Sequence, residues 1–107
     1  IRRAYLTGRM ASLVFTWDPA KARANLRKHG VSFAEAQSVF YDDCARLVDD
    51  PDHSESEDRF ILLGLSEGAR VLIVVHAYRE PEGLIRIISA RKATPRERAG
   101  YDRGSRP

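Results

Sequence analysis

The 107-residue sequence predicts an α+β fold: a mostly antiparallel sheet of four or five strands, with two N-terminal helices packed on one face and a short C-terminal helix. Three observations predict this class. Helix-capping signals occur twice near the start of the chain and once near its end. β-Rich runs lie between them, at residues 59–65, 70–79 and 84–91. Four residues separate each pair of runs, and such short connections join only antiparallel neighbours.

The first strand and the first helix are predicted from residues 13–30. Residues 13–17 are β-branched and aromatic, as is typical of a strand. Asp18 provides a side-chain acceptor at a helix N-cap, and Pro19 stands at the first helical position. We expect the helix to end near Gly30, a residue suited to a left-handed cap. The spacing predicts a thin apolar stripe of Ala22 and Leu26 and a separate polar face of Lys21, Asn25 and Lys28.

A second helix is predicted to begin at Ser32. Ser32 and Glu35 form a capping box, in which each side chain can bond the backbone of the other. Asp42 and Asp43 would oppose the helix dipole at a C-terminus, so the helix should stop just before them. Apolar residues at i, i+3 and i+7 predict its buried face: Phe33, Ala36 and Phe40.

The sheet is predicted from residues 44–49 and the three later runs, whose side chains alternate between two faces. In 70–79 a set that is nearly all aliphatic is expected to face the helices: Val71, Ile73, Val75, Ala77 and Arg79. The other set should form an open, functional face: Leu72, Val74, His76 and Tyr78. In the last run, strict alternation places Arg86, Ile88 and Ala90 on one face and Ile87, Ser89 and Arg91 on the other.

A third helix is predicted from the capping box of Thr94 and Glu97, with Pro95 at its first position. Gly100 should weaken this helix. We expect residues 1–9, which precede the only methionine, Met10, to be a leader or remnant outside the core. Residues 10–103 then form a single domain, and residues 104–107 form a frayed tail.

Composition excludes several classes of protein. The longest apolar run, residues 71–75, is only five residues long, so no membrane association is expected. The single cysteine, Cys44, excludes an internal disulfide framework and fits a reducing, cytoplasmic location. There is no glycine-rich phosphate loop, no cysteine pair for zinc and no HExxH helix.

Charge is distributed unevenly along the chain, whose formal net charge is +3. Eight of the 15 acidic residues fall between Asp42 and Asp58, where Arg46 is the only base. Elsewhere the chain carries 17 basic and seven acidic side chains, which is enough for a continuous basic surface that attracts polyanions. A solvated surface of mixed sign is the alternative that charge alone leaves open.

The histidines and the acidic band are further candidates for chemistry. His29 stands at a helix end, where a plain cap is the alternative role. His53 belongs to an acidic loop, and His76 lies in an aliphatic strand where a core role competes with a catalytic one. The acidic residues between 42 and 52, together with His53, also leave open a Mg²⁺ or Mn²⁺ site.

Three motifs, in order along residues 13–102, resemble those of the BrnT toxin family. The first motif begins with Trp17-Asp18-Pro19, and the last motif includes Arg86 and Arg91. Gly100 departs from the helix formers usual in the family. The matching segments are residues 17–21 and 25–36 near the start, 51–54 and 59–60 in the middle, and 85–98 with Tyr101 near the end.

The resemblance implies a RelE-like fold and a ribonuclease that blocks translation as the toxin of a type II toxin–antitoxin system. It further implies neutralisation by a BrnA-like antitoxin with a ribbon–helix–helix domain, in a heterotetramer built around an antitoxin dimer. Operator DNA would then be bound only through the antitoxin. No cofactor is implied.

RNA cleavage without a metal needs a base for the 2′-OH, cations for the developing phosphorane and an acid for the leaving oxygen. We expect an unshielded cationic surface beside the last strand to supply the cations. The catalytic candidates are Arg91 and Arg86 as charge stabilisers and His53 and His29 as acid or base. The RNA-binding candidates are Lys28, Lys21, Arg59, Arg96 and Arg98, and the reserve candidates are His76, Tyr78 and Tyr101.

Two alternatives to this mechanism stay open at the level of sequence. A non-catalytic module could bind RNA or a partner protein and inhibit by occupancy, which needs basic residues but no acid–base pair. A metal-dependent nuclease could instead use the acidic band. A transcription factor is disfavoured because no predicted helix combines length with a basic, base-reading face.

Overall fold

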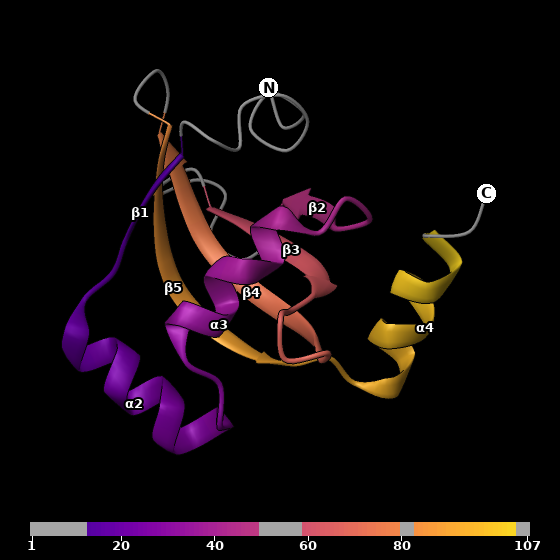
Figure 1. Cartoon of the computed structure of the whole chain (residues 1–107), viewed down its shortest axis with the longest axis horizontal. Coiled ribbons are helices and arrows are strands. Elements are labelled where there is room, and N and C mark those ends of the chain that lie inside the picture. Colours follow the sequence, from indigo (N-terminus) through magenta and orange to yellow (C-terminus); the bar gives the residue numbers. More distant parts are fainter. Residues whose placement is uncertain (1–12, 50–58, 80–82, 105–107) are drawn as a thin grey trace.

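The computed structural model describes residues 13–49, 59–79 and 83–104 and has the predicted α+β architecture (Figure 1). The described strands form one five-stranded sheet in the order β1-β5-β4-β3-β2, in which β1 runs parallel to β5 and the other neighbours are antiparallel. The elements are β1 (Val14–Thr16), α2 (Pro19–His29), α3 (Phe33–Ser38), the 3₁₀ helix η2 (Val39–Tyr41), β2 (Arg46–Asp49), β3 (Arg59–Leu65), β4 (Val71–Arg79), β5 (Leu84–Lys92) and α4 (Pro95–Gly104).

The predicted ends of α2 are confirmed. The Asp18 side chain accepts a hydrogen bond from the Ala20 N–H, and Gly30 ends the helix in the left-handed region at φ 70°. The predicted apolar stripe is wrong at Leu26, which is 51% exposed. The residue buried in its place is Asn25.

Asn25 is buried because its side chain completes backbone hydrogen bonds between α2 and the sheet. Its amide donates to the carbonyl oxygens of Val31, at 2.9 Å, and of Ala90 on β5, at 2.8 Å. Its oxygen accepts from the Ala90 N–H at 3.1 Å. These bonds satisfy the side chain inside the protein and fix α2 against β5.

The predicted buried face of the second helix is also confirmed. Phe33, Ala36 and Phe40 are at most 2% exposed, and the helix stops before Asp42 after a turn of 3₁₀ helix. The two phenylalanines lie in the main core cluster, where Trp17 and Phe15 pack on them edge to face at 5.9 and 5.1 Å between ring centroids.

The predicted facing of β4 is wrong. Leu72, Val74 and His76 are fully buried on the side of the helices, and Tyr78 joins the same core cluster. The His76 ring lies 4.8 Å from that of Phe40, edge to face. The prediction failed because both faces of β4 are apolar. Hydrophobicity therefore does not indicate which set of side chains lies beneath the helices.

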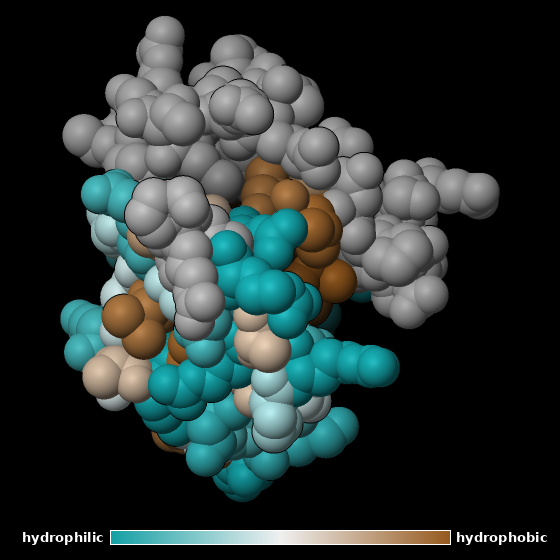
Figure 2. Space-filling view, turned by 90° about the vertical axis from the view of Figure 1, so that its right-hand side faces the viewer, coloured by the Kyte–Doolittle hydropathy of each residue, from teal (hydrophilic) through white to brown (hydrophobic). Residues whose placement is uncertain are grey.

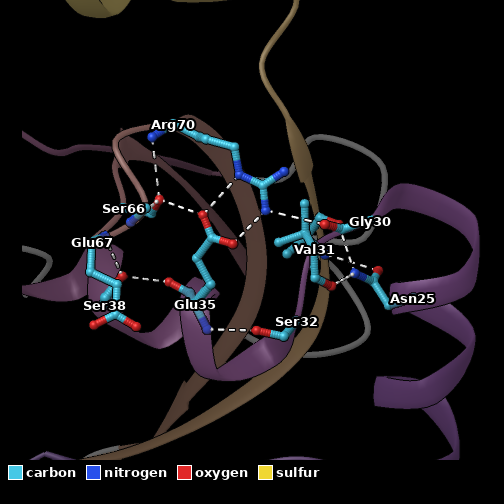
Figure 3. Close-up of polar contacts among 11 residues, drawn as sticks. Asn25, Gly30, Val31, Ser32, Glu35, Ser38, Ser66, Glu67 and Arg70 are labelled. Carbon is cyan, nitrogen blue, oxygen red and sulfur yellow. Dashed lines mark hydrogen bonds and ion pairs between the residues drawn. The ribbon is translucent and has the colours of Figure 1, made fainter.

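A polar network joins the α2–α3 connection to the β3–β4 turn (Figure 3). Glu35 Oε2 accepts hydrogen bonds from Arg70 Nε at 3.0 Å and from Ser66 Oγ at 2.6 Å, and Glu35 Oε1 pairs with Arg70 Nη2. Arg70 also donates to the Gly30 carbonyl at 3.1 Å. The Glu35 pKa is lowered, chiefly by the hydrogen bond from Arg70. The network therefore stabilises the fold, and both Nε and Nη2 of Arg70 are hydrogen-bonded in it.

The C-terminal helix α4 begins at the predicted capping box. The Glu97 N–H donates to Thr94 Oγ1 at 3.2 Å, and the Thr94 N–H donates to Glu97 Oε1 at 2.8 Å. Figure 1 shows α4 on the opposite side of the sheet from α2. The predicted leader, residues 1–9, lies outside the described residues, as do residues 105–107 of the predicted tail.

Candidate nucleic-acid-binding face

The sheet face opposite α2 and α3 carries the candidate arginines, and we call it the outer face. Residues directly opposite each other on neighbouring strands point to the same side, so the strand register assigns every residue to a face. The outer face has an apolar centre of Ile61, Leu63, Ile73, Val75 and Ala77, and its arginines are Arg46, Arg59, Arg79, Arg86 and Arg91.

A register shift brings Arg86 and Arg91 to the same face. Val75 pairs with Ser89 while His76 pairs with Ile87, so Ile88 has no partner on β4. Such a bulge reverses the alternation of side chains on one strand. The prediction that Arg86 and Arg91 lie on opposite faces is therefore wrong, because it assumed uninterrupted alternation.

Two of the arginines flank one small residue. Arg59 on β3 and Arg86 on β5 are both opposite Ala77 on β4, which is 7% exposed. Their strands are two spacings apart, which places their Cα atoms about 10 Å from each other. Both guanidinium groups start from rigid strands, so the sheet fixes the separation of their positive charges.

Two further arginines of the outer face contact α4. Arg91 forms a two-pronged ion pair with Glu97, in which Nη1 meets Oε1 and Nη2 meets Oε2, each at 2.9 Å. Arg46 Nη1 donates to the Gly100 carbonyl at 3.0 Å. Across the sheet, Arg46, Leu63, Ile73 and Arg91 are paired in one row, and Ile73 in its middle is 6% exposed. The two arginines therefore attach α4 to the outer face on both sides of Ile73.

The ion pair contradicts the expectation that Arg91 is unshielded. The hydrogen bond from Arg91 is the main cause that lowers the Glu97 pKa to about 2, and Glu97 raises the Arg91 pKa in return. Both groups are therefore charged at neutral pH. The two side chains stay accessible, with 40% of Arg91 and 32% of Glu97 exposed, so the pair is exchangeable with solvent ions.

Two reserve candidates are engaged within the protein. Tyr101 is 8% exposed and donates its hydroxyl to Asp42 Oδ2 at 2.7 Å. Burial, followed by the bond to Asp42, raises the Tyr101 pKa, so its phenol stays protonated. Tyr78 is buried in the core cluster.

His76 does not face the arginines. Its side chain is fully buried beneath the helices, and its Nδ1 lies 3.3 Å from the Val74 carbonyl oxygen. Burial lowers the His76 pKa to about 4, so the ring is neutral near pH 7. Of the two interpretations that the sequence left open for His76, the structure favours the core role.

The remaining candidates are divided between the two sides of the sheet. Lys21 and Lys28 are exposed on α2, and His29 is half-buried at its end, so the structure does not bring them together with the arginines of the outer face. Arg96 and Arg98 are exposed on α4, next to Glu97. His53 lies outside the described residues.

The surface seen from the α4 side is mainly hydrophilic, with a hydrophobic zone beside it (Figure 2). α4 contributes three arginines and two acidic residues to this side. Among residues 13–49, 59–79 and 83–104 no group of three metal-ligating side chains is present. Part of the acidic band that could bind a metal, including Asp50 and Asp52, falls outside these ranges.

The fold and the outer face define a small α+β protein with arginines arranged around an apolar strip of sheet. A family model for the BrnT ribonuclease toxin of type II toxin–antitoxin systems matches residues 17–97. The chain therefore belongs to the BrnT family of ribonuclease toxins.

A solved structure agrees with this assignment at the level of fold. The 1.1 Å crystal structure of the Brucella abortus ribonuclease toxin, BrnT, is similar with a TM-score of 0.59 and 23% sequence identity. The similarity covers 77% of this chain and 97% of that one. No curated protein matches the sequence. No helix in the described part of the chain is long and apolar enough to cross a membrane.

Sequence reasoning missed two residues that shape the outer face. Glu97 was predicted only as a capping residue, and Arg46 only as the lone base in an acidic band. A signal for Glu97 was present, since a capping box returns its side chain toward Thr94, three residues after Arg91. No comparable signal existed for Arg46, whose contact with Gly100 spans 54 residues.

Proposed function

We propose that this protein is an endoribonuclease toxin that cleaves RNA at its outer face and thereby inhibits translation. The observation that carries the proposal is the match of residues 17–97 to a family of ribonuclease toxins. The proposed location of cleavage is supported by the five arginines that border one sheet face. Guanidinium groups bind phosphate oxygens through two parallel hydrogen bonds, which suits them to an RNA backbone.

In the proposed mechanism Arg86 and Arg91 stabilise the negative charge of the phosphorane, and Arg59, Arg96 and Arg98 bind flanking phosphates. The 2′-OH attacks the adjacent phosphorus and the 5′-oxygen leaves, so the product carries a 2′,3′-cyclic phosphate. His53 is the candidate acid or base. The roles of Lys21 and Lys28 in RNA binding and of His29 as acid or base stay predictions. These residues lie on α2, so any RNA they contact would be bound apart from the arginines of the outer face.

The proposal includes a metal-independent reaction. Attack by the 2′-OH requires a base, an acid and positive charge, all of which side chains can supply. We expect the purified protein to cut single-stranded RNA equally well with and without a chelator and to leave cyclic phosphate ends. Loss of cutting in the chelator would point instead to the metal-dependent mechanism.

Occupancy without cleavage is the second candidate function, and one observation favours it. His76 is buried, and the Tyr101 hydroxyl is bonded to Asp42, so neither is placed to move a proton at the outer face. Retention of intact RNA by the purified protein under all metal conditions would establish this alternative.

We further propose that a BrnA-like antitoxin with a ribbon–helix–helix domain neutralises the protein in the cytoplasm. The family's membership of type II toxin–antitoxin systems supports a protein antitoxin. Operator DNA would be bound only through this partner. Co-expression with the protein encoded by the adjacent reading frame should restore growth and give a heterotetramer by light scattering, whereas growth arrest that persists would contradict the pairing.

A further inference from the structure

The Glu97 carboxylate fills a site built from three hydrogen-bond donors. Its Oε1 accepts from Arg91 Nη1 at 2.9 Å and from the Thr94 N–H at 2.8 Å. Its Oε2 accepts from Arg91 Nη2 at 2.9 Å. A planar fork of two N–H groups, with a third donor beside it, suits a phosphate group as well as a carboxylate.

The surroundings of this site favour a polyanion over a single carboxylate. Arg96 and Arg98, exposed on either side of Glu97 in the sequence, add positive charge to this helix. The site opens to solvent, since 40% of the Arg91 side chain is exposed. Exchange of one anion for another therefore needs no opening of the core.

Release of Glu97 would leave α4 attached. Tyr101 still donates to Asp42, and Arg46 still donates to the Gly100 carbonyl, at the far side of the same row of the sheet. The Thr94 hydroxyl still accepts from the Glu97 backbone N–H, so the helix keeps half of its cap. Only a side chain has to rotate, because both members of the ion pair are accessible to solvent.

We infer that Arg91 and the Thr94 N–H form an anion site that Glu97 fills in the free protein and that a phosphate group of the RNA fills in the complex. The inference rests on the proposed function and adds its regulation: Glu97 is an internal competitor that lowers RNA affinity. It predicts that removing the carboxylate strengthens RNA binding, although the same residue stabilises the helix that borders the site.

The test uses Glu97→Gln in the full chain, because glutamine also completes a capping box and so preserves the start of α4. Binding is measured with a 2′-O-methyl RNA oligonucleotide, which cannot be cleaved. We expect E97Q to bind about fivefold more tightly than the unaltered protein. The matched control is Glu67→Gln, which changes the net charge equally at an exposed turn position. A gain of the same size in E67Q would show a general charge effect and overturn the inference.

A double-mutant cycle with Arg91→Ala distinguishes this inference from the proposed function. If the RNA phosphate replaces Glu97 at Arg91, then E97Q has no effect once Arg91 is absent. RNA affinity unchanged in R91A would remove Arg91 from the binding surface and contradict the proposed location of the site. Weaker binding by R91A, together with no gain in E97Q, would leave that location standing and overturn the competition alone.

A direct readout follows the Glu97 carboxyl group by NMR during a pH titration. In the free protein the Arg91 guanidinium holds the Glu97 pKa near 2. On binding of the 2′-O-methyl RNA, a displaced Glu97 loses this partner, and its pKa should rise toward the ordinary value of a glutamate. A Glu97 pKa that stays low in the saturated complex would show that the carboxylate remains on Arg91.

Discussion

The two faces of the single sheet are both rich in apolar side chains, yet they differ in what borders them. On the helix-covered face, Phe40 and His76 are buried, and Asn25, the buried residue of α2, has its hydrogen bonds satisfied inside the protein. On the outer face, arginines stand around an aliphatic strip, and a single short helix is fastened to two of them. The helix-covered face therefore supplies stability, and the outer face presents positive charge.

The first prediction concerns a substitution in the core of the helix-covered face. Phe40 is fully buried between Phe15 and His76, so Phe40→Ala removes the contacts that join η2 to the sheet and leaves a cavity. We expect the free energy of unfolding to fall by about 3–5 kcal/mol in denaturant titration. A loss below about 1 kcal/mol would mean that this face is not the stabilising core.

The second prediction uses the pH dependence of stability. Burial lowers the pKa of His76 to about 4, against 6.5 for an unburied histidine. The unfolded chain therefore binds more protons between these values, and stability that is complete above pH 6.5 is lost as the pH falls toward 4. The expected loss is about 3 kcal/mol, measured by denaturant titration at a series of pH values.

The control for this prediction is His76→Phe, which keeps an aromatic ring beside Phe40 but cannot titrate. Its stability should be flat between pH 6.5 and 4.5. Glu35 and Glu97 act in a lower window, since their lowered pKa values give stability that is present above 4.5 and lost below it. A slope between pH 6.5 and 4.5 that persists in H76F would assign the effect to another group.

The third prediction concerns the fastening of α2. Asn25→Ala leaves the Ala90 N–H and two carbonyl oxygens without their side-chain partner inside the protein. We expect a loss of about 1–3 kcal/mol in unfolding free energy. Leu26→Ala, one position along the same helix at a 51% exposed residue, is the control and should change it by less than about 0.5 kcal/mol.

The smallest predicted effect is at the outer face. Arg46→Ala removes one hydrogen bond to the end of α4, between exposed groups. Global stability should change by less than about 1 kcal/mol, while amide hydrogen exchange in α4 becomes faster than in β4. Unchanged exchange in α4 would show that the Arg46 bond does not hold the helix.

Much of the fold is predictable because its signals are local. The N-caps at Asp18, Ser32 and Thr94 and the left-handed Gly30 each depend on a few neighbouring residues and are confirmed. Of the capping box predicted for Ser32 and Glu35, only the bond from the Glu35 N–H to Ser32 Oγ forms, since the Glu35 carboxylate bonds Arg70 and Ser66 instead. The orientation of β4 is not determined by neighbouring residues in the sequence. Both of its faces are buried over much of its length, so only the partners beneath the helices decide which set of side chains lies there.

The candidate site is less predictable for the same reason. The bulge at Ile88 decides which face Arg86 shares with Arg91, and it depends on how β5 pairs with β4. The shared outer face of Arg59 and Arg86 depends on register across three strands. Pairing of Arg91 with Glu97 was accessible from the capping box, because that box fixes where the carboxylate points.

The most direct test of the account compares RNA cleavage and stability in two double variants, each lacking two arginines. R86A/R91A alters the outer face, and R23A/R27A alters exposed positions on α2 at the other side of the sheet. We predict that R86A/R91A loses at least about 10²-fold in cleavage rate while its unfolding free energy stays within about 1 kcal/mol of the unaltered protein, and that R23A/R27A keeps its cleavage rate. Undiminished cleavage by folded R86A/R91A would contradict the assignment of the outer face as the catalytic surface.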